Sequence, residues 1–122
     1  MGVVHRYTGE EGAFDWEGVT EKFYQAADVK GVTAKVLVGP AEEAPDFRIR
    51  YFRVALGGCT SLDQHPHDHG VFILHGRASV RLGEEEVEVG PRDVVYVPGG
   101  EVHQFRTLGD EPLGFLCVIP AV

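Results

Sequence analysis

The sequence predicts an all-β protein that folds as a single antiparallel β-barrel. Three observations lead to this class. Glycine and proline are frequent, with 16 and 7 residues among 122, and 43% of the residues are hydrophobic. Short runs of alternating apolar and polar residues follow one another between turn residues, which is the pattern of strands with one buried face. The length suits one domain with a real core, so we expect no second domain.

Residues 1–31 have the least regular pattern of the chain. Charged residues separate its large apolar side chains, which are Phe14, Trp16, Val19, Phe23 and Tyr24. We expect an N-terminal arm of short strands or turns, with a short helix over residues 20–27 as a weaker alternative. Because an arm this aromatic is poorly solvated, it should pack on the outside of the barrel or across a partner subunit. The barrel itself is expected over residues 32–122.

Two strands are expected next, over residues 32–39 and 47–56. The first alternates valine and alanine with polar residues until Gly39-Pro40 ends it. In the second, the two faces carry Phe47, Ile49 and Tyr51 on one side and Arg48, Arg50 and Phe52 on the other. We expect the arginines to lie on a solvated face.

The remaining strands are expected over residues 69–74, 77–82, 86–89, 93–97, 103–107 and 113–120. The first of these is apolar on both sides, which is typical of a strand that is covered twice. One cover is the barrel interior, and the other is the N-terminal arm or a second subunit. On this ground we expect a homodimer.

Residues 57–76, GGCTSLDQHPHDHGVFILHG, indicate a metal site. Asp63 and His65 are two apart on an extended segment and share a face, and a bend at the following proline brings His69 back toward them. His103 opens a later strand after a Pro-Gly-Gly turn and supplies a fourth ligand. Imidazole and carboxylate are ligands that transition metals favour.

At these residues the sequence resembles the cupin superfamily. The first cupin motif corresponds to Gly57, Asp63-x-His65, His69 and Gly76, with every gap kept. The second corresponds to Pro98-x-Gly100-x-x-His103, although Arg92 and Thr107 replace its glycine and asparagine. The closest likeness is to small single-domain cupins with an HxHPWxHE stretch and four histidine ligands, and it covers nearly the whole chain.

This resemblance implies a jelly-roll barrel that holds one divalent transition metal through Asp63, His65, His69 and His103. Asp63 stands where the four-histidine relatives have their first histidine. Because aspartate is shorter than histidine, the metal must shift toward it or Asp63 must bind through water. His67 is expected at the pocket rim, with ligation in a shifted register as the alternative. The other reading is a cupin scaffold whose metal site has lapsed.

The resemblance and the strand parity together predict a narrow apolar pocket over the metal. Its expected lining residues are Phe105, Phe115, Cys117 and Ile119. The ligand set suits Mn, Fe, Co, Ni, Cu or Zn without choosing among them. The first hypothesis is therefore a metal-dependent, dioxygenase-like oxidoreductase acting on a small apolar or aromatic compound, with no catalytic residue assigned.

Two alternatives stay open at this point. One is a non-catalytic cupin that binds a small ligand or a metal. The other is a sugar isomerase or epimerase, which is weaker because no arginine or lysine cluster lies on the expected inner faces. An Asp63→His change separates a tuned site from a lapsed one.

Charge and composition limit the partners. The 19 acidic and 11 basic residues give a formal net charge of −8, which argues against binding to nucleic acid or to anionic membranes. No apolar run is long enough to cross a bilayer and no signal-peptide core is present, so we expect a cytoplasmic protein with a small-molecule partner. Cys59 and Cys117 are expected to be free thiols, and His5 and His75 to be solvated.

Overall fold

The computed structural model describes residues 2–121, and this part of the chain contains nine β-strands and one short 3-10 helix. The strands are β1 (Glu21–Tyr24), β2 (Lys30–Val38), β3 (Phe47–Cys59), β4 (His69–His75), β5 (Arg77–Leu82), β6 (Glu85–Val89), β7 (Val94–Val97), β8 (His103–Leu108) and β9 (Leu113–Pro120). The 3-10 helix η1 spans Pro40–Glu42. The predicted all-β class is confirmed. No helix within the described residues is long and apolar enough to span a membrane.

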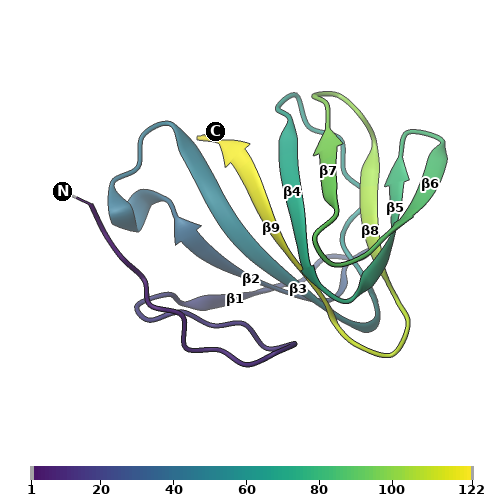
Figure 1. The fold of residues 1–122 in the computed structure, drawn as a ribbon. Coiled ribbons are helices and arrows are strands. Elements are labelled where there is room, and N and C mark those ends of the chain that lie inside the picture. The colour runs from purple at the N-terminus through teal and green to yellow at the C-terminus, as the bar shows by residue number, and fades with distance from the viewer. Residues whose placement is uncertain (1, 122) are drawn as a thin grey trace.

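The strands form one curled antiparallel sheet in the order β6-β5-β8-β3-β9-β4-β7, with β2 and then β1 added beside β3 (Figure 1). The long strand β3 pairs with β2 and β9 and reaches β8 at its end, where Cys59 lies opposite Arg106. It thus connects the two halves of the curled sheet. The arrangement agrees with the predicted jelly-roll barrel.

Two expected elements differ from the structure. Residues 21–24 form β1, not a helix, and pair with β2. The turn expected at Gly57-Gly58 is instead part of β3, which continues to Cys59. Gly57 has a φ of +68°, and a Cβ at Gly58 would overlap the carbonyl of Lys30. The two glycines therefore let the strand bend past β2 without leaving the sheet.

The core lies between the two halves of the sheet. It contains fully buried side chains from five strands, namely Val54, Ile73, Val80, Val97 and Leu113. Strand β4 shows the alternation that places a site residue: His69, Val71 and Ile73 point inward while Gly70 and Phe72 lie on the other side. The inward face of β4 thus carries His69 into the barrel.

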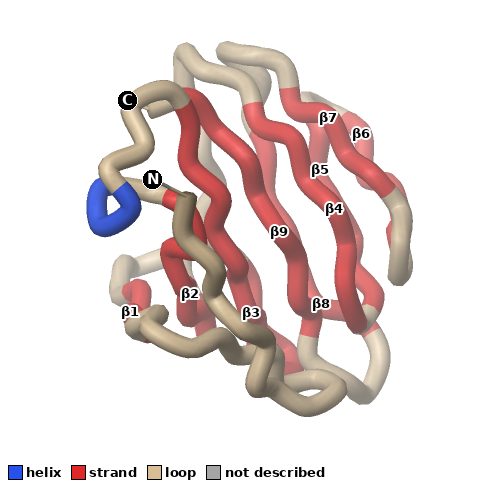
Figure 2. Tube along the Cα trace, turned by 60° about the vertical axis from the view of Figure 1, so that its left-hand side comes forward, coloured by secondary structure: helices blue, strands red, loops and turns tan. Residues whose placement is uncertain are grey.

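The N-terminal arm packs on the outer face of its own barrel, across β2 and β3 (Figure 2). Phe14 stacks on Tyr51 with ring centroids 5.8 Å apart, and Trp16 meets the same ring edge-on at 5.3 Å. Lys35 Nζ on β2 donates a 2.9 Å hydrogen bond to the carbonyl of Phe14. These contacts partly bury Phe14 and Trp16, whereas Phe23 and Tyr24 on β1 remain exposed.

His75 is buried under this arm, at 5% exposure, which corrects the expectation that it is solvated. Its Nδ1 lies 2.9 Å from the carbonyl of Pro112 and must donate, because a carbonyl only accepts. Its Nε2 then accepts from the Tyr51 hydroxyl at 2.5 Å. Burial raises the pKa of Tyr51 to about 12, so the phenol stays a neutral donor. His5 also differs from expectation, since it is half-buried and contacts Glu42.

The outer face of β4 is not covered by the arm, and we propose that the expected homodimer forms there. Four large apolar side chains remain exposed on this face, namely Phe72, Val94, Tyr96 and Val118. Val94 is 72% exposed and Tyr96 is 61% exposed. They are contiguous because β4 pairs with both β7 and β9. We predict a sedimenting mass of twice 13.4 kDa at micromolar concentration.

A Val94→Asp variant should weaken this dimer at least about tenfold, because it places an unpaired charge in an apolar interface. Val87→Asp, at an exposed valine on β6, is the matched control and should sediment like the wild type. A wild-type protein that sediments as a monomer would reject the dimer.

Candidate metal centre

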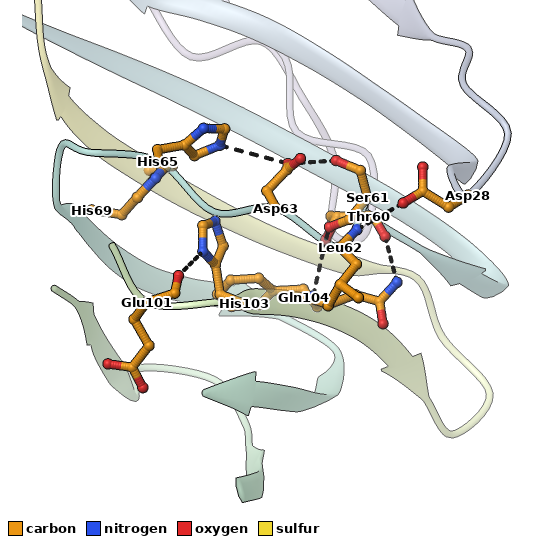
Figure 3. A network of polar contacts seen from close by, with 12 residues as sticks. Asp28, Thr60, Ser61, Leu62, Asp63, His65, His69, Glu101, His103 and Gln104 are labelled. Atoms are coloured by element: carbon orange, nitrogen blue, oxygen red, sulfur yellow. Dashed lines mark hydrogen bonds and ion pairs between the residues drawn. The ribbon is translucent and has the colours of Figure 1, made fainter. Parts of the chain in front are cut away.

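Three histidines from separate elements meet at one end of the barrel. His69 begins β4, His103 begins β8, and His65 lies on the segment between β3 and β4. Each offers one ring nitrogen, and these three atoms all lie within 4.8 Å of one another (Figure 3). His69 and His103 are buried and His65 is partly exposed. Such a group of imidazoles has the composition of a transition-metal site.

The hydrogen bonds of His103 and His69 leave donor atoms for a metal. His103 Nδ1 lies 2.9 Å from the carbonyl of Glu101, so Nδ1 carries the proton and the Nε2 lone pair is free. His69 Nδ1 lies 3.4 Å from Cys117 Sγ. Its Nε2 is buried and has no hydrogen-bond partner in the described part of the chain. A buried nitrogen without a partner, inside a group of three, is what a divalent ion would satisfy.

The electrostatics agree with this fit. Burial, and then the neighbouring His103, lower the pKa of His69 to about 4. The ring is therefore neutral at physiological pH, which is the form that binds a metal. On these grounds the residues present fit one divalent transition metal.

Asp63 lies beside the group but does not belong to it. Its main chain pairs with that of His103 through N–H to O distances of 3.0 and 2.9 Å. Its carboxylate Oδ2 accepts a hydrogen bond from Ser61 Oγ and lies 3.7 Å from His65 Nε2. The three-histidine group thus forms without the carboxylate, and ligation by Asp63, directly or through water, stays a proposal.

His67 lies beside the rings of His65 and His69. Its ring is parallel to that of His65, with centroids 4.9 Å apart and an interplanar angle of 5°. It also lies 4.9 Å from the ring of His69. Burial, and then the charge of His65, lower the pKa of His67. The close group consists of His65, His69 and His103 and does not include His67.

A pocket of about 100 Å³ lies over the three histidines. Its other lining residues are Arg50, Phe52, Thr60, Asp63, Val71, Phe105, Phe115 and Cys117. Phe105 and Phe115 stack with centroids 4.7 Å apart and form one apolar wall. Ile119 does not line this pocket, although it shares parity with Cys117. It packs in the core and borders a different hollow with Phe47 and Pro120.

This geometry can be compared with known proteins. Residues 50–119 match the model of the Cupin_2 family, described as the cupin domain. The matched region is more than half of the chain and contains all three clustered histidines. The chain belongs to the cupin family. At the positions where the four-histidine type has its first histidine and its tryptophan, this cupin has Asp63 and His67.

Relatives support the same assignment over nearly the whole chain. The 1-methylthio-D-xylulose 5-phosphate methylsulfurylase of Rhodospirillum rubrum is 40% identical over 111 residues, which is 88% of this chain and 70% of that protein. A cupin-2 domain crystal structure from the same organism is 38% identical, with a TM-score of 0.84, covering 96% of this chain and 78% of that one. The polyketide cyclase RemF from Streptomyces resistomycificus is 27% identical, with a TM-score of 0.82, covering 100% of this chain and 80% of that one.

The cupin pocket also contains Arg50, although the sequence predicts a solvated face for this arginine. Arg50 Nη2 lies 3.6 Å from Cys117 Sγ, and its guanidinium carbon lies 4.8 Å from the centre of the Phe52 ring. Its Nε is buried and has no hydrogen-bond partner within the described residues. The signal that was missed is the shared parity of Arg50 with Phe52 and Val54, whose side chains need an apolar environment.

Burial also raises the pKa of the Cys117 thiol, and the nearby Arg50 opposes part of that rise. The pocket therefore combines three imidazoles, one guanidinium and one thiol against a wall of phenylalanines. A neutral apolar compound would leave the guanidinium without a partner. The site thus suits a small molecule with an anionic or strongly polar group.

Proposed function

We propose that this cupin is a metal-dependent enzyme that acts on a small carbonyl compound bearing an anionic group, the class to which ketose phosphates belong. The single observation that carries the proposal is that Arg50 lines the same pocket as the three histidines. A partly buried guanidinium, whose Nε is buried and has no hydrogen-bond partner within the described residues, lies in the same pocket as three clustered imidazoles and indicates a substrate anion close to the metal centre.

His65, His69 and His103 would hold the ion. A divalent metal at this position supplies a Lewis acid for a carbonyl oxygen. The chain's own residues then account for binding and orientation. Arg50 binds the anionic group, and Phe105 and Phe115 exclude water from one side of the pocket.

The name of the Rhodospirillum relative supports this substrate class. The enzyme named there acts on a phosphorylated ketose that carries a methylthio group. Arg50 supplies one cation on the inner face of the barrel, so the case against sugar phosphates as substrates becomes weaker. Cys117 is a thiol in the pocket wall beside Arg50, at the end of the pocket where the anionic group would bind.

Activity assays test the proposal directly. The metal-loaded protein should turn over 1-methylthio-D-xylulose 5-phosphate or a related ketose phosphate without consuming oxygen. An Arg50→Leu variant should lose about 10- to 100-fold in kcat/KM, chiefly through KM, since a charge-assisted hydrogen bond is worth about 1.5–3 kcal/mol. Arg50→Lys should recover part of this loss.

Arg48→Leu is the matched control, because Arg48 lies on the same strand and, within residues 2–121, its side chain donates only to the main-chain carbonyls of Ala44 and Phe47. It should keep wild-type kinetics. Equal losses in the Arg48→Leu and Arg50→Leu variants would show that net charge, and not the pocket guanidinium, sets the rate.

A second candidate is the dioxygenase-like oxidoreductase predicted from the sequence. The stacked Phe105 and Phe115 beside the imidazole group favour it, because they suit an aromatic substrate. Oxygen uptake with a panel of phenols, diketones and thiols, without turnover of any ketose phosphate, would select this candidate. Tight metal binding without turnover on either panel would leave the non-catalytic binding module.

A further inference from the structure

A second cavity adjoins the metal pocket. It has a volume of about 90 Å³ and is lined by Tyr24, Val29, Val32, Phe52, Thr60, Ser61 and Asp63. Three of these residues, Phe52, Thr60 and Asp63, also line the metal pocket. The two cavities are therefore neighbours that share one wall, and we call the second cavity the side pocket.

The far part of the side pocket is apolar. Its residues there are Tyr24, Val29 and Val32, with Phe52 at the junction. The ring of Tyr24 lies 5.8 Å from that of Phe52, which in turn stacks on Phe115 at 5.3 Å. An aromatic wall thus runs without a break from the metal pocket into the side pocket.

The segment that closes the side pocket is held in place by hydrogen bonds. Asp28 Oδ2 accepts from the main-chain N–H of Leu62 at 3.0 Å, and the carbonyl of Asp28 accepts from Cys59 Sγ at 3.5 Å. Figure 3 shows Asp28 beside the 60–62 segment that leads to the histidines. Because these contacts fix the residue before Val29, the side pocket is formed before any ligand arrives.

Charge determines which part of a ligand enters this space. Asp63 stands at the junction, with its carboxylate on the side shared by both cavities. An anionic group would be repelled there and attracted to Arg50 on the other side. A neutral, apolar group is what the side pocket suits.

We propose that the side pocket binds a neutral apolar substituent of the substrate, such as a short alkyl or alkylthio chain, while the polar end lies over the histidines and Arg50. This inference rests on the proposed function for the position of the polar end. At about 30 Å³ per heavy atom, the space accepts roughly three such atoms. Val29 belongs to the apolar part of the lining that the metal pocket does not share, so its size should set the room for this chain.

Straight-chain alkyl hydroxamates test this with the cobalt-loaded protein. The hydroxamate end chelates the metal, and the visible absorption of cobalt reports both metal loading and hydroxamate binding. From acetohydroxamate to hexanohydroxamate, each added methylene that enters the side pocket should lower Kd about fourfold, until a plateau at about three carbons beyond the first.

Two variants of Val29 should move the plateau in opposite directions. Val29→Phe fills the side pocket, so the longer hydroxamates should bind no better than acetohydroxamate. Val29→Ala enlarges the side pocket, so the plateau should shift to longer chains. This variant keeps the proposal testable if the phenylalanine of Val29→Phe disturbs folding. In both variants the Kd of acetohydroxamate should stay within about twofold of wild type. Val87→Phe, at an exposed valine on β6, is the bulk control and should match wild type.

The outcomes separate this inference from the function that it deepens. Two results would overturn the side-pocket proposal alone, provided that the protein binds cobalt. One is a hydroxamate Kd that does not depend on chain length, and the other is the same dependence on chain length in wild type and in both Val29 variants. Failure to bind cobalt would overturn the proposed metal-dependent function and the side-pocket proposal with it.

Discussion

Replacing His69 with alanine is expected to lower the affinity of the protein for divalent cobalt or zinc by at least about 100-fold. Even changes next to metal ligands commonly cost 10- to 100-fold in affinity, and the loss of a ligand costs more. His69 offers the buried Nε2 without a hydrogen-bond partner in the described part of the chain, so it is the clearest ligand of the three. Elemental analysis of the purified protein and a cobalt titration measure the effect.

His67→Ala is the matched control for this prediction. It removes an imidazole from the same segment, two residues away, that stacks on His65 but lies outside the close group. Its metal stoichiometry should equal that of the wild type. Thermal unfolding of the metal-free forms checks that both variants fold. If His67→Ala lost the metal and His69→Ala kept it, the three-histidine group would be wrong.

The barrel and the expected approach of His65, His69 and His103 came from strand alternation together with the resemblance to cupins. Strand alternation and turn residues place His69 and His103 at the starts of inward-facing strands, and the structure has them there. Alternation places each histidine on its strand, while the pairing of the two segments rested on the cupin motifs.

The side chain of Asp63 was not predictable in this way. Its position in the motif suggests a ligand, but its carboxylate accepts a hydrogen bond from Ser61, two residues earlier. The competition between a neighbouring hydroxyl and a metal is decided by local rotamers, which strand parity does not describe. The sequence identifies Asp63 as a candidate but does not predict in which direction its side chain points.

The two faces of β3 were assigned the wrong way round for a similar reason. Both faces carry large apolar residues, so alternation alone does not tell which one meets the pocket. The arm decides it by covering Tyr51 on the outside, which leaves Arg50 and Phe52 facing inward. A segment more than thirty residues away thus determines the charge of the pocket.

His75 shows the same limit, and its environment gives the largest expected effect on stability. His75 pairs with Gly114 across β4 and β9, and its ring lies over that glycine, where a Cβ would overlap it. A Gly114→Ala variant must displace the buried ring and break its bonds to Tyr51 and Pro112. We expect the free energy of unfolding to fall by about 3 kcal/mol, from overpacking and two lost buried hydrogen bonds.

Gly70→Ala is the matched control on the neighbouring strand. A Cβ at Gly70 meets nothing within 4 Å, and neither this glycine nor Gly114 has a positive φ. Both substitutions therefore have the same backbone cost and differ only in what the methyl group meets. Urea unfolding of Gly70→Ala should stay within about 0.5 kcal/mol of wild type.

A His75→Ala background decides whether the ring is the cause. With the imidazole gone, the alanine at position 114 has room, so adding Gly114→Ala should then cost less than about 1 kcal/mol. The difference from the cost in wild type is the coupling energy between the two positions. Additive costs would instead mean that the backbone of β9, and not the overlap with His75, requires glycine at this position.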